Sequence, residues 1–279
     1  MFTALFDEFA LAIAGHDRDV DLFGAAMTIS RLSGRDVDVH AHAHRLDLVG
    51  EAVLQHAGSG AGAGELAHAI DHQLFTVMGF RGATTSGNDP SNSFLADVID
   101  RREGIPITLS LVYMEVAQRV GLRCDGVGYP RHFIVRCGEP EDPLYIDPFN
   151  QGTRIDRAEL LSGLRTTAPG GAAPEAMLCA VTRRQILQRM LTNLHRIFRE
   201  ARDVERWLAT VELRLRLEPW TAALVGERGM LHYRMGQPAL ALADLERYVG
   251  GGGRAAAVSG AVRLLDQLRA RNTEPEEMP

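Results

Sequence analysis

The segment at residues 107–120 most constrains how this chain can fold. Its side chains are apolar on almost every side of a helical projection, and it lies between Pro106 and Gly121. Proline suits the first turn of a helix, where its missing N–H group costs nothing, and glycine commonly ends a helix. A helix that is apolar all round is normally buried. The sequence therefore predicts a central helix around which neighbouring segments pack.

Three short segments after this helix are predicted strands, and the first two have the alternating pattern of β-strands. They are residues 122–128, 131–137 and 144–147, separated by turns that contain proline. In the second segment His132 would share a face with Ile134, and Cys137 would lie on the opposite face. A helix followed by consecutive strands favours an antiparallel sheet packed on the helix. We therefore predict an α+β core.

The first 78 residues have the apolar spacing of helices and contain two groups of histidines. Three of these histidines alternate along one predicted helix, which spreads their side chains around its axis. The other two are four residues apart but lack the glutamate of an HExxH motif. The histidines are His40, His42, His44, His68 and His72. Neither group has the further ligands that zinc requires, so no metal or cofactor is expected.

All 30 basic residues of the chain are arginine. Schiff-base chemistry, the phosphate-binding P-loop and a Ser-Lys dyad all need a lysine amine, so these are excluded. The formal net charge of -6 disfavours nucleic acids and anionic membranes as partners, since both usually require a basic face. Asp7 and Glu8 interrupt the first apolar run and no long uncharged run follows. Neither a signal peptide nor a membrane span is expected.

The three cysteines, Cys124, Cys137 and Cys179, lack the CxxC spacing of zinc and redox sites. Their odd number disfavours a structural disulfide framework. These features predict a protein of the reducing cytoplasm.

Six short motifs are distributed over much of the chain. They are GFRG at residues 79–82, Asn92-Ser93, GIPITLS at 104–110, YPRHF at 129–133, IDPFNQG at 146–152 and RMLTNL at 189–194. Together they resemble the bacterial invasion-regulator SirB-type transglutaminase-like family, which is related to a domain of a eukaryotic F-box protein. The resemblance implies a papain/transglutaminase-like core. In that core a cysteine opens a buried helix, a histidine starts a following strand and an aspartate lies on the next strand.

The resemblance places Pro106 at the cysteine position, and His132 and Asp147 at the histidine and aspartate positions. In a Cys-His-Asp site the histidine removes the thiol proton, the helix N-terminus stabilises the thiolate and the aspartate fixes the imidazole tautomer. Proline has no nucleophilic atom, so acyl transfer by this mechanism is not expected. His132 and Asp147 would then either bind a ligand or tie two strands together through a buried hydrogen bond.

Several substitutes for the missing thiol remain open. Ser110 lies one turn beyond Pro106, although a buried serine on a helix commonly bonds a helix carbonyl. Cys124 could approach from its strand, although a cysteine there is more often a small core residue. His132 and Asp147 could also activate a water molecule, or hold a metal ion together with another group.

Beyond a stretch rich in glycine, alanine and proline at residues 166–176, which we interpret as a linker, the chain has a helical pattern. Two segments correspond at an offset of 34 residues, the period of the tetratricopeptide repeat (TPR). The corresponding pairs are His195 and Gly229, Trp207 and Ala241, Val211 and Leu245, and Pro219 and Gly253. We predict a transglutaminase-like domain with a helical lead-in at residues 1–165 and an all-α TPR-like region at 177–272.

The leading hypothesis is a non-catalytic transglutaminase-like module that binds a protein or peptide, for which the resemblance implies a regulatory role. The alternative is a residual hydrolase or amide-processing enzyme that uses His132 and Asp147 with Ser110, Cys124 or an activated water. Arginines are concentrated at residues 183–206. We interpret them as a solvated helix face, with an acidic peptide partner as the sharper alternative.

Overall fold

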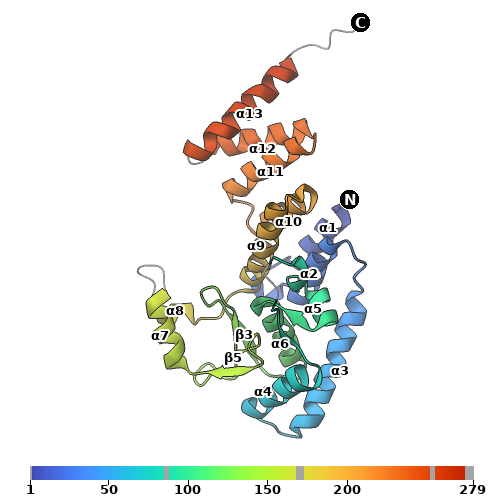
Figure 1. The fold of residues 1–279 in the computed structure, drawn as a ribbon, viewed down its shortest axis with the longest axis vertical. Coiled ribbons are helices and arrows are strands. Elements are labelled where there is room, and N and C mark those ends of the chain that lie inside the picture. Colours follow the sequence, from blue (N-terminus) through green and yellow to red (C-terminus); the bar gives the residue numbers. More distant parts are fainter. Residues whose placement is uncertain (1, 85–87, 168–172, 252–254, 274–279) are drawn as a thin grey trace. The chain divides into compact units, whose positions relative to one another are not determined.

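The computed structural model describes residues 2–84, 88–167, 173–251 and 255–273 (Figure 1). The chain divides into two compact units, which we call the core unit, Leu11–Met190, and the repeat unit, Met1–Ala10 with Leu191–Pro279. The boundary falls inside one helix, α9 (Arg183–Ala201). The first two turns of α9 therefore belong to the core unit.

The core unit contains one buried central helix, α6 (Pro106–Arg119), and further helices. The others are α2 (Leu22–Ser30), α3 (Val39–Ala57), α4 (Ala63–Asp71), the π-helix η3 (His72–Val77), α5 (Leu95–Arg101), α7 (Arg157–Thr167) and α8 (Pro174–Met177), with the 3-10 turns η1 (Asp17–Asp19), η2 (Arg31–Ser33) and η4 (Pro90–Asn92). Leu109, Val112, Tyr113 and Val116 of α6 are each at most 2% exposed. Helices α3, α4 and α5 contact α6. The prediction of a central buried helix is confirmed.

An antiparallel sheet packs on α6. Its strands, in the order β3-β4-β5-β6, are β3 (Cys124–Val127), β4 (Ile134–Cys137), β5 (Leu144–Asp147) and β6 (Thr153–Ile155). The sequence predicted the first three strands but not β6, which is mostly exposed. It also extended β4 too far, because this strand begins at Ile134 and His132 lies in the preceding turn. A two-stranded parallel ladder, β1 (Arg81–Gly82) with β2 (Glu103–Gly104), leads into α6.

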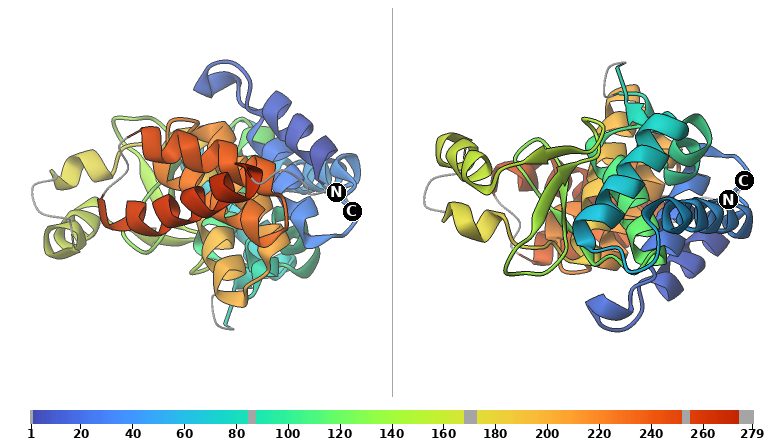
Figure 2. Two further views of the ribbon diagram at one scale, coloured as in Figure 1. Left: turned by 90° about the horizontal axis from the view of Figure 1, so that it is seen from above. Right: turned by 90° about the horizontal axis from the view of Figure 1, so that it is seen from below.

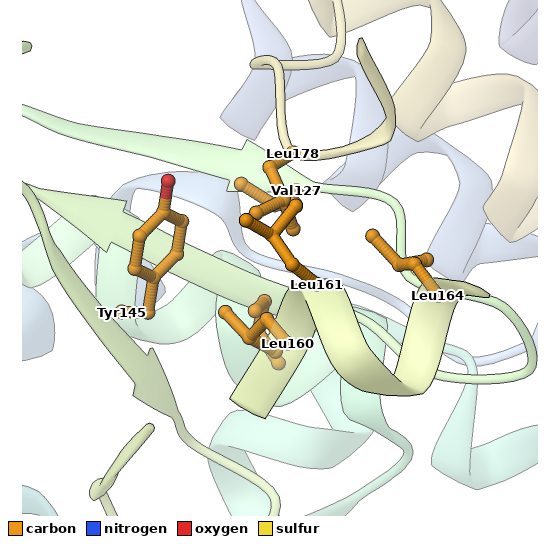
Figure 3. Close-up of a cluster of buried hydrophobic side chains, with 7 residues drawn as sticks. Val127, Tyr145, Leu160, Leu161, Leu164 and Leu178 are labelled. Atoms are coloured by element: carbon orange, nitrogen blue, oxygen red, sulfur yellow. The ribbon is translucent and has the colours of Figure 1, made fainter. Parts of the chain in front are cut away.

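Helix α7 packs on the sheet through a small apolar cluster. Figure 3 shows Leu160, Leu161 and Leu164 of α7 gathered with Val127 of β3 and with Leu178, and Ile134 and Tyr145 complete the buried set. The strands lie between α6 on one side and α7 with α8 on the other (Figure 2). The predicted linker at 166–176 overlaps the end of α7 and the start of α8, and residues 168–172 lie outside the described residues.

The repeat unit consists of paired helices. They are the end of α9, α10 (Val204–Leu217), α11 (Ala222–Arg234), α12 (Pro238–Gly250) and α13 (Ala255–Thr273), together with the first residues of α1 (Thr3–Ala12). Helices α10 and α12 begin at Val204 and Pro238, 34 residues apart, as the repeat predicts. Gly229 allows α12 to approach closely, because an added Cβ would lie 3.1 Å from the side chains of Asp244 and Leu245.

Among the described residues, every helix is too short or too polar to cross a lipid bilayer.

Candidate functional site

His132 ends a tight turn that precedes β4. Its backbone N–H donates to the Tyr129 carbonyl over 3.0 Å. Arg131, within this turn, has a φ of 58°, a left-handed conformation that residues other than glycine rarely adopt. Because this conformation is unfavourable, contacts from elsewhere in the fold must hold the turn that carries His132.

Arg189 of α9 supplies such contacts. Its guanidinium donates to the carbonyl of Tyr129 over 3.1 Å and to the carbonyl of His132, and it stacks 5.3 Å from the centre of the Phe133 ring. Burial lowers the pKa of Arg189 below its usual value. No carboxylate lies within ion-pair distance of it in the described part of the chain. The sequence placed Arg189 on a solvated face, but its guanidinium bonds the turn of His132.

The Asp147 carboxylate at the end of β5 accepts four hydrogen bonds. Oδ2 lies 2.7 Å from His132 Nε2 and 2.8 Å from Asn150 Nδ2, and Oδ1 accepts from the backbone N–H groups of Phe149 and Asn150. Burial acts to raise the pKa of Asp147, but the bonds from His132 and Asn150 outweigh it and lower the pKa below its ordinary value. The carboxylate is therefore ionised, and the structure brings the predicted pair together.

Pairing with an ionised carboxylate fixes the imidazole tautomer. Nε2 of His132 carries the hydrogen that Asp147 accepts, so in the neutral ring Nδ1 keeps a free lone pair. The His132 side chain is 25% exposed, against 6% for Asp147. It lines a cavity of about 470 Å³ together with Tyr129, Ile134, Ile155, Glu159, Leu160, Ser162 and Gly163. Helix α7, which the sequence did not predict, forms one wall of this cavity.

Phe149 connects the His132–Asp147 pair to the start of α6. Its ring stands edge-on to the imidazole, with 5.8 Å between the ring centres. The ring also rests on Gly82 of β1, where an added Cβ would lie 2.7 Å from it. Gly82 pairs with Gly104, two residues before Pro106. Gly82 therefore leaves room for the aromatic ring between His132 and the strands that lead into α6.

None of the proposed side-chain nucleophiles bonds His132 in the described residues. Pro106 is the first residue of α6. The Ser110 hydroxyl is fully buried and donates to the Phe133 carbonyl over 3.4 Å. Cys124 is joined to Cys137 in a disulfide. Neither Ser110 nor Cys124 is therefore placed as the substitute nucleophile that the alternative hypothesis requires.

The disulfide corrects the expectation from the cysteine count. Cys124 and Cys137 face each other in the β3–β4 register, which an odd number of cysteines cannot reveal, and Cys179 is free and exposed. Cys124 also pairs with the end of β4 that is farther from His132. The expectation of a cytoplasmic protein rested partly on unpaired cysteines and loses that support.

A second polar cluster supports the turn after Asp147. Asp71 of α4 accepts hydrogen bonds from the Tyr113 hydroxyl at 3.1 Å and lies 2.7 Å from the Arg154 guanidinium. It also packs on Gly152, where an added Cβ would meet it at 2.5 Å. Burial raises the pKa of Asp71 to about 6, although Arg154 and Tyr113 act to lower it. The sequence gave no signal for this cluster, because its members come from three distant elements.

Metal binding finds no support in the described chain. No group of three or more histidine, cysteine, aspartate or glutamate side chains is arranged there to hold a metal ion. His42 instead bonds the Asp38 carbonyl through Nδ1, at 2.7 Å. His72 stacks on the His56 ring with 4.4 Å between centres.

Comparison with known proteins agrees with the fold. A family model described as the transglutaminase-like superfamily matches residues 40–192, and a tetratricopeptide repeat model matches residues 194–271. A UPF0162 protein of Xylella fastidiosa is 36% identical over 186 residues, which are 65% of this chain and 66% of that protein. A UPF0162 protein of Pseudomonas aeruginosa is 30% identical over 232 residues, 81% of this chain and 83% of that protein.

The core also has a eukaryotic relative. F-box only protein 21 of Mus musculus is 33% identical over 136 residues, which are 45% of this chain and 21% of that protein. The predicted α+β core with its buried helix and antiparallel sheet, followed by TPR-like helices, is confirmed by the two family models and by the fold. Since one model covers residues 40–192 of 279 and the Pseudomonas relative aligns over most of its length, the chain belongs to the transglutaminase-like superfamily, among the UPF0162 proteins.

Proposed function

We propose that this protein binds a protein or peptide partner and does not catalyse acyl transfer. The observation that carries the proposal is Pro106 at the first position of α6, where the family resemblance places the nucleophilic cysteine. The Ser110 hydroxyl donates to a backbone carbonyl and the Cys124 sulfur lies in a disulfide. Acyl transfer would therefore lack an attacking side chain, and His132 and Asp147 would shape a binding site.

Two features support the binding half of the proposal. Cavities lined mainly by apolar side chains with a few fixed polar groups are typical ligand sites, and the cavity beside His132 has this character. TPR helices, which stack into extended surfaces used for binding, match residues 194–271. A regulatory role of the SirB type belongs to the same proposal, because a protein that only binds can act through the partner that it recruits.

Affinity capture with variants of the purified full chain tests the proposal. The wild type is compared with a His132→Ala, Asp147→Ala double variant, and with His16→Ala, Asp19→Ala as a matched control at an exposed His–Asp pair. We expect one specific partner that the wild type and the control retain and the double variant loses. Unchanged capture by the double variant would show that the partner does not bind at His132, and the repeat unit would remain as the proposed binding region. Capture of no partner would contradict a binding function.

One observation favours a second candidate, a hydrolase that acts through water. His132 lines a cavity of about 470 Å³ and bonds Asp147 through Nε2, and an imidazole oriented by a carboxylate can remove a proton from water. Ammonia release from glutamine-containing peptides separates the two candidates. A binding protein releases no more ammonia than the double variant does. Release that is lost on His132→Ala would establish the hydrolase and overturn the non-catalytic proposal.

A further inference from the structure

A second cavity, of about 290 Å³, lies in the repeat unit beside α11. Its lining residues are Trp207, Ala223, Gly226, Glu227, Met230, Leu231, Arg234, Tyr248 and Ala261. Ala223, Met230 and Arg234 recur at helical spacing, so they lie along one face of α11. Gly226 brings the Tyr248 ring against this helix, because an added Cβ would lie 2.9 Å from that ring. The cavity is therefore lined by aromatic and aliphatic side chains from α10, α11, α12 and α13.

The acid of this cavity, Glu227, is half-buried, and its carboxylate is hydrogen-bonded by groups of its own unit. Glu227 Oε1 accepts from Trp207 Nε1 and from His195 Nε2, each at 2.8 Å. Burial acts to raise the pKa of Glu227, but the His195 and Trp207 bonds outweigh it, and the pKa falls below the ordinary value. Arg214 in turn lies 2.7 Å from His195 Nδ1. Glu227 is thus an ionised carboxylate that two hydrogen bonds from its own unit hold in place.

Arg234, in contrast, has no acidic partner among the side chains that the structure describes. Its guanidinium stacks on Trp207, 5.4 Å from the ring centre. Within the described residues no carboxylate lies in ion-pair distance of it, whereas Arg228, on the same helix, pairs with both Glu212 and Asp244. Met230 lies one turn before Arg234 and is 43% exposed. The mouth of the cavity therefore combines an exposed apolar side chain with an uncompensated positive charge.

We infer that this cavity, which we call the α11 pocket, binds an apolar side chain of a protein partner that is flanked by carboxylates, one of which pairs with Arg234. The apolar walls favour an apolar side chain of the partner, which we call the anchor, since burial of a leucine-sized side chain stabilises a complex. Arg234 accounts for the acidic flank, because a guanidinium binds a carboxylate through directed hydrogen bonds. This inference rests on the proposed protein-binding function. It adds which segment of the partner binds, an apolar residue flanked by carboxylates, and where it binds, the α11 pocket.

NMR titration of the full chain with 13C-labelled methionine methyl groups tests the inference, because Met230 lines the pocket. The probe is the acetylated and amidated peptide Ser-Glu-Leu-Glu-Ser. Two matched peptides serve as controls: Ser-Glu-Ser-Glu-Ser lacks the anchor, and Ser-Lys-Leu-Lys-Ser reverses the flanking charge. We expect a saturable shift of the Met230 methyl signal with the first peptide, at a dissociation constant of about 1 mM or lower. Each control peptide should bind at least about tenfold more weakly.

Variants identify the residues involved. Arg234→Glu should weaken binding of the acidic peptide at least about tenfold and strengthen binding of the lysine peptide. Ala223→Phe, at an exposed position on α11, should fill the mouth and abolish the Met230 shift. Arg196→Glu makes the same charge change at a position outside the pocket lining and should leave the affinity unchanged. Circular dichroism of each variant checks that the helices remain folded.

Absence of a Met230 shift with the acidic peptide, or equal binding of the acidic and lysine peptides, would overturn the inference. Binding of the acidic peptide to the Ala223→Phe variant as tightly as to the wild type would also overturn the inference. The titration is independent of the capture experiment at His132. A failed titration with successful capture would reject only the α11 pocket, and a Met230 shift without any captured partner would leave the pocket established and the wider function open.

Discussion

At the scale of single residues, the family resemblance places His132 and Asp147 at the histidine and aspartate positions of a cysteine-type site and Pro106 at its cysteine position. His132 and Asp147 lie 2.7 Å apart, the carboxylate is fully hydrogen-bonded, and Pro106 opens α6. A buried polar pair that is fully satisfied adds rigidity, whereas loss of one partner leaves the other uncompensated. The His132–Asp147 pair can thus serve only to stabilise the fold. Experiments on Pro106 distinguish this role from that of a pair that lies beside the nucleophile position.

Pro106→Cys should restore a reactive thiol if position 106 faces the imidazole. A helix N-terminus and a neighbouring histidine both stabilise a thiolate, so we expect the introduced thiol to react with iodoacetamide at neutral pH faster than an ordinary cysteine does. The variant is made in a Cys179→Ser background, because Cys179 is free and exposed. Adding His132→Ala should slow the reaction about tenfold or more. Equal rates with and without His132 would show that residue 106 is not at the nucleophile position.

Asp71 should make the stability of the protein depend on pH in an unusual direction. Its pKa is raised from 3.8 to about 6 by burial, so between these values the folded state binds more protons than the unfolded state. Stability contributed by protonated Asp71 is therefore present below pH 3.8 and is lost as pH rises through 6. We expect the free energy of unfolding of the wild type, relative to Asp71→Asn, to fall between about pH 4 and pH 7.

Urea denaturation of the wild type and of Asp71→Asn across this pH range measures the difference between their free energies of unfolding. Titrating groups that the two proteins share contribute equally to both and cancel in this difference. A 13C NMR titration of the Asp71 carboxyl checks its pKa directly. A constant difference between wild type and variant, or a carboxyl that titrates near 4, would contradict the raised pKa.

At the scale of elements, the sequence predicted what local pattern determines. The buried helix α6 follows from its all-round apolar surface, and β5 with Asp147 follows from a short apolar run that ends before Pro148. Strand β6 carries Thr153 and Arg154 on an exposed edge, so it has no apolar alternation to detect. The Cys124–Cys137 disulfide and the contact of Arg189 with the His132 turn depend on register and tertiary packing. Spacing along the chain does not encode them.

Helix α7 contributes to the core through its packing on the sheet, although the sequence did not predict it. Leu164 is fully buried in the cluster that joins α7 to the sheet, and Arg165, next to it, is exposed. We expect Leu164→Ala to reduce the free energy of unfolding by about 2–4 kcal/mol, because it leaves a cavity in this cluster. Arg165→Ala should change it by less than about 0.5 kcal/mol. Chemical denaturation measures both, and an equal effect of the two substitutions would show that α7 does not depend on this packing.

At the scale of the whole molecule, α9 takes part in both units. In its first turns the backbone N–H groups of Arg183 and Arg184 donate to Asp17 at 3.0 Å each, and Arg189 bonds the turn of His132. Ile186, Leu187 and Met190 are at most 1% exposed. The helix that leads into the TPR repeats therefore also completes the core around the candidate site, so a division of the chain at the preceding loop would cut through the core unit.

Two truncated chains test this assignment. We expect residues 11–201, which include α9, to fold and unfold cooperatively, and residues 11–177, which end before it, to be less stable by several kcal/mol, since each buried apolar side chain contributes about 1.5–3 kcal/mol. Thermal unfolding followed by circular dichroism compares them. Arg189→Met in the longer chain isolates the contribution of the guanidinium, about 1–3 kcal/mol for the carbonyls it leaves unbonded. Equal stability of the two truncated chains would place the start of α9 outside the core and leave Arg189 without a part in holding His132.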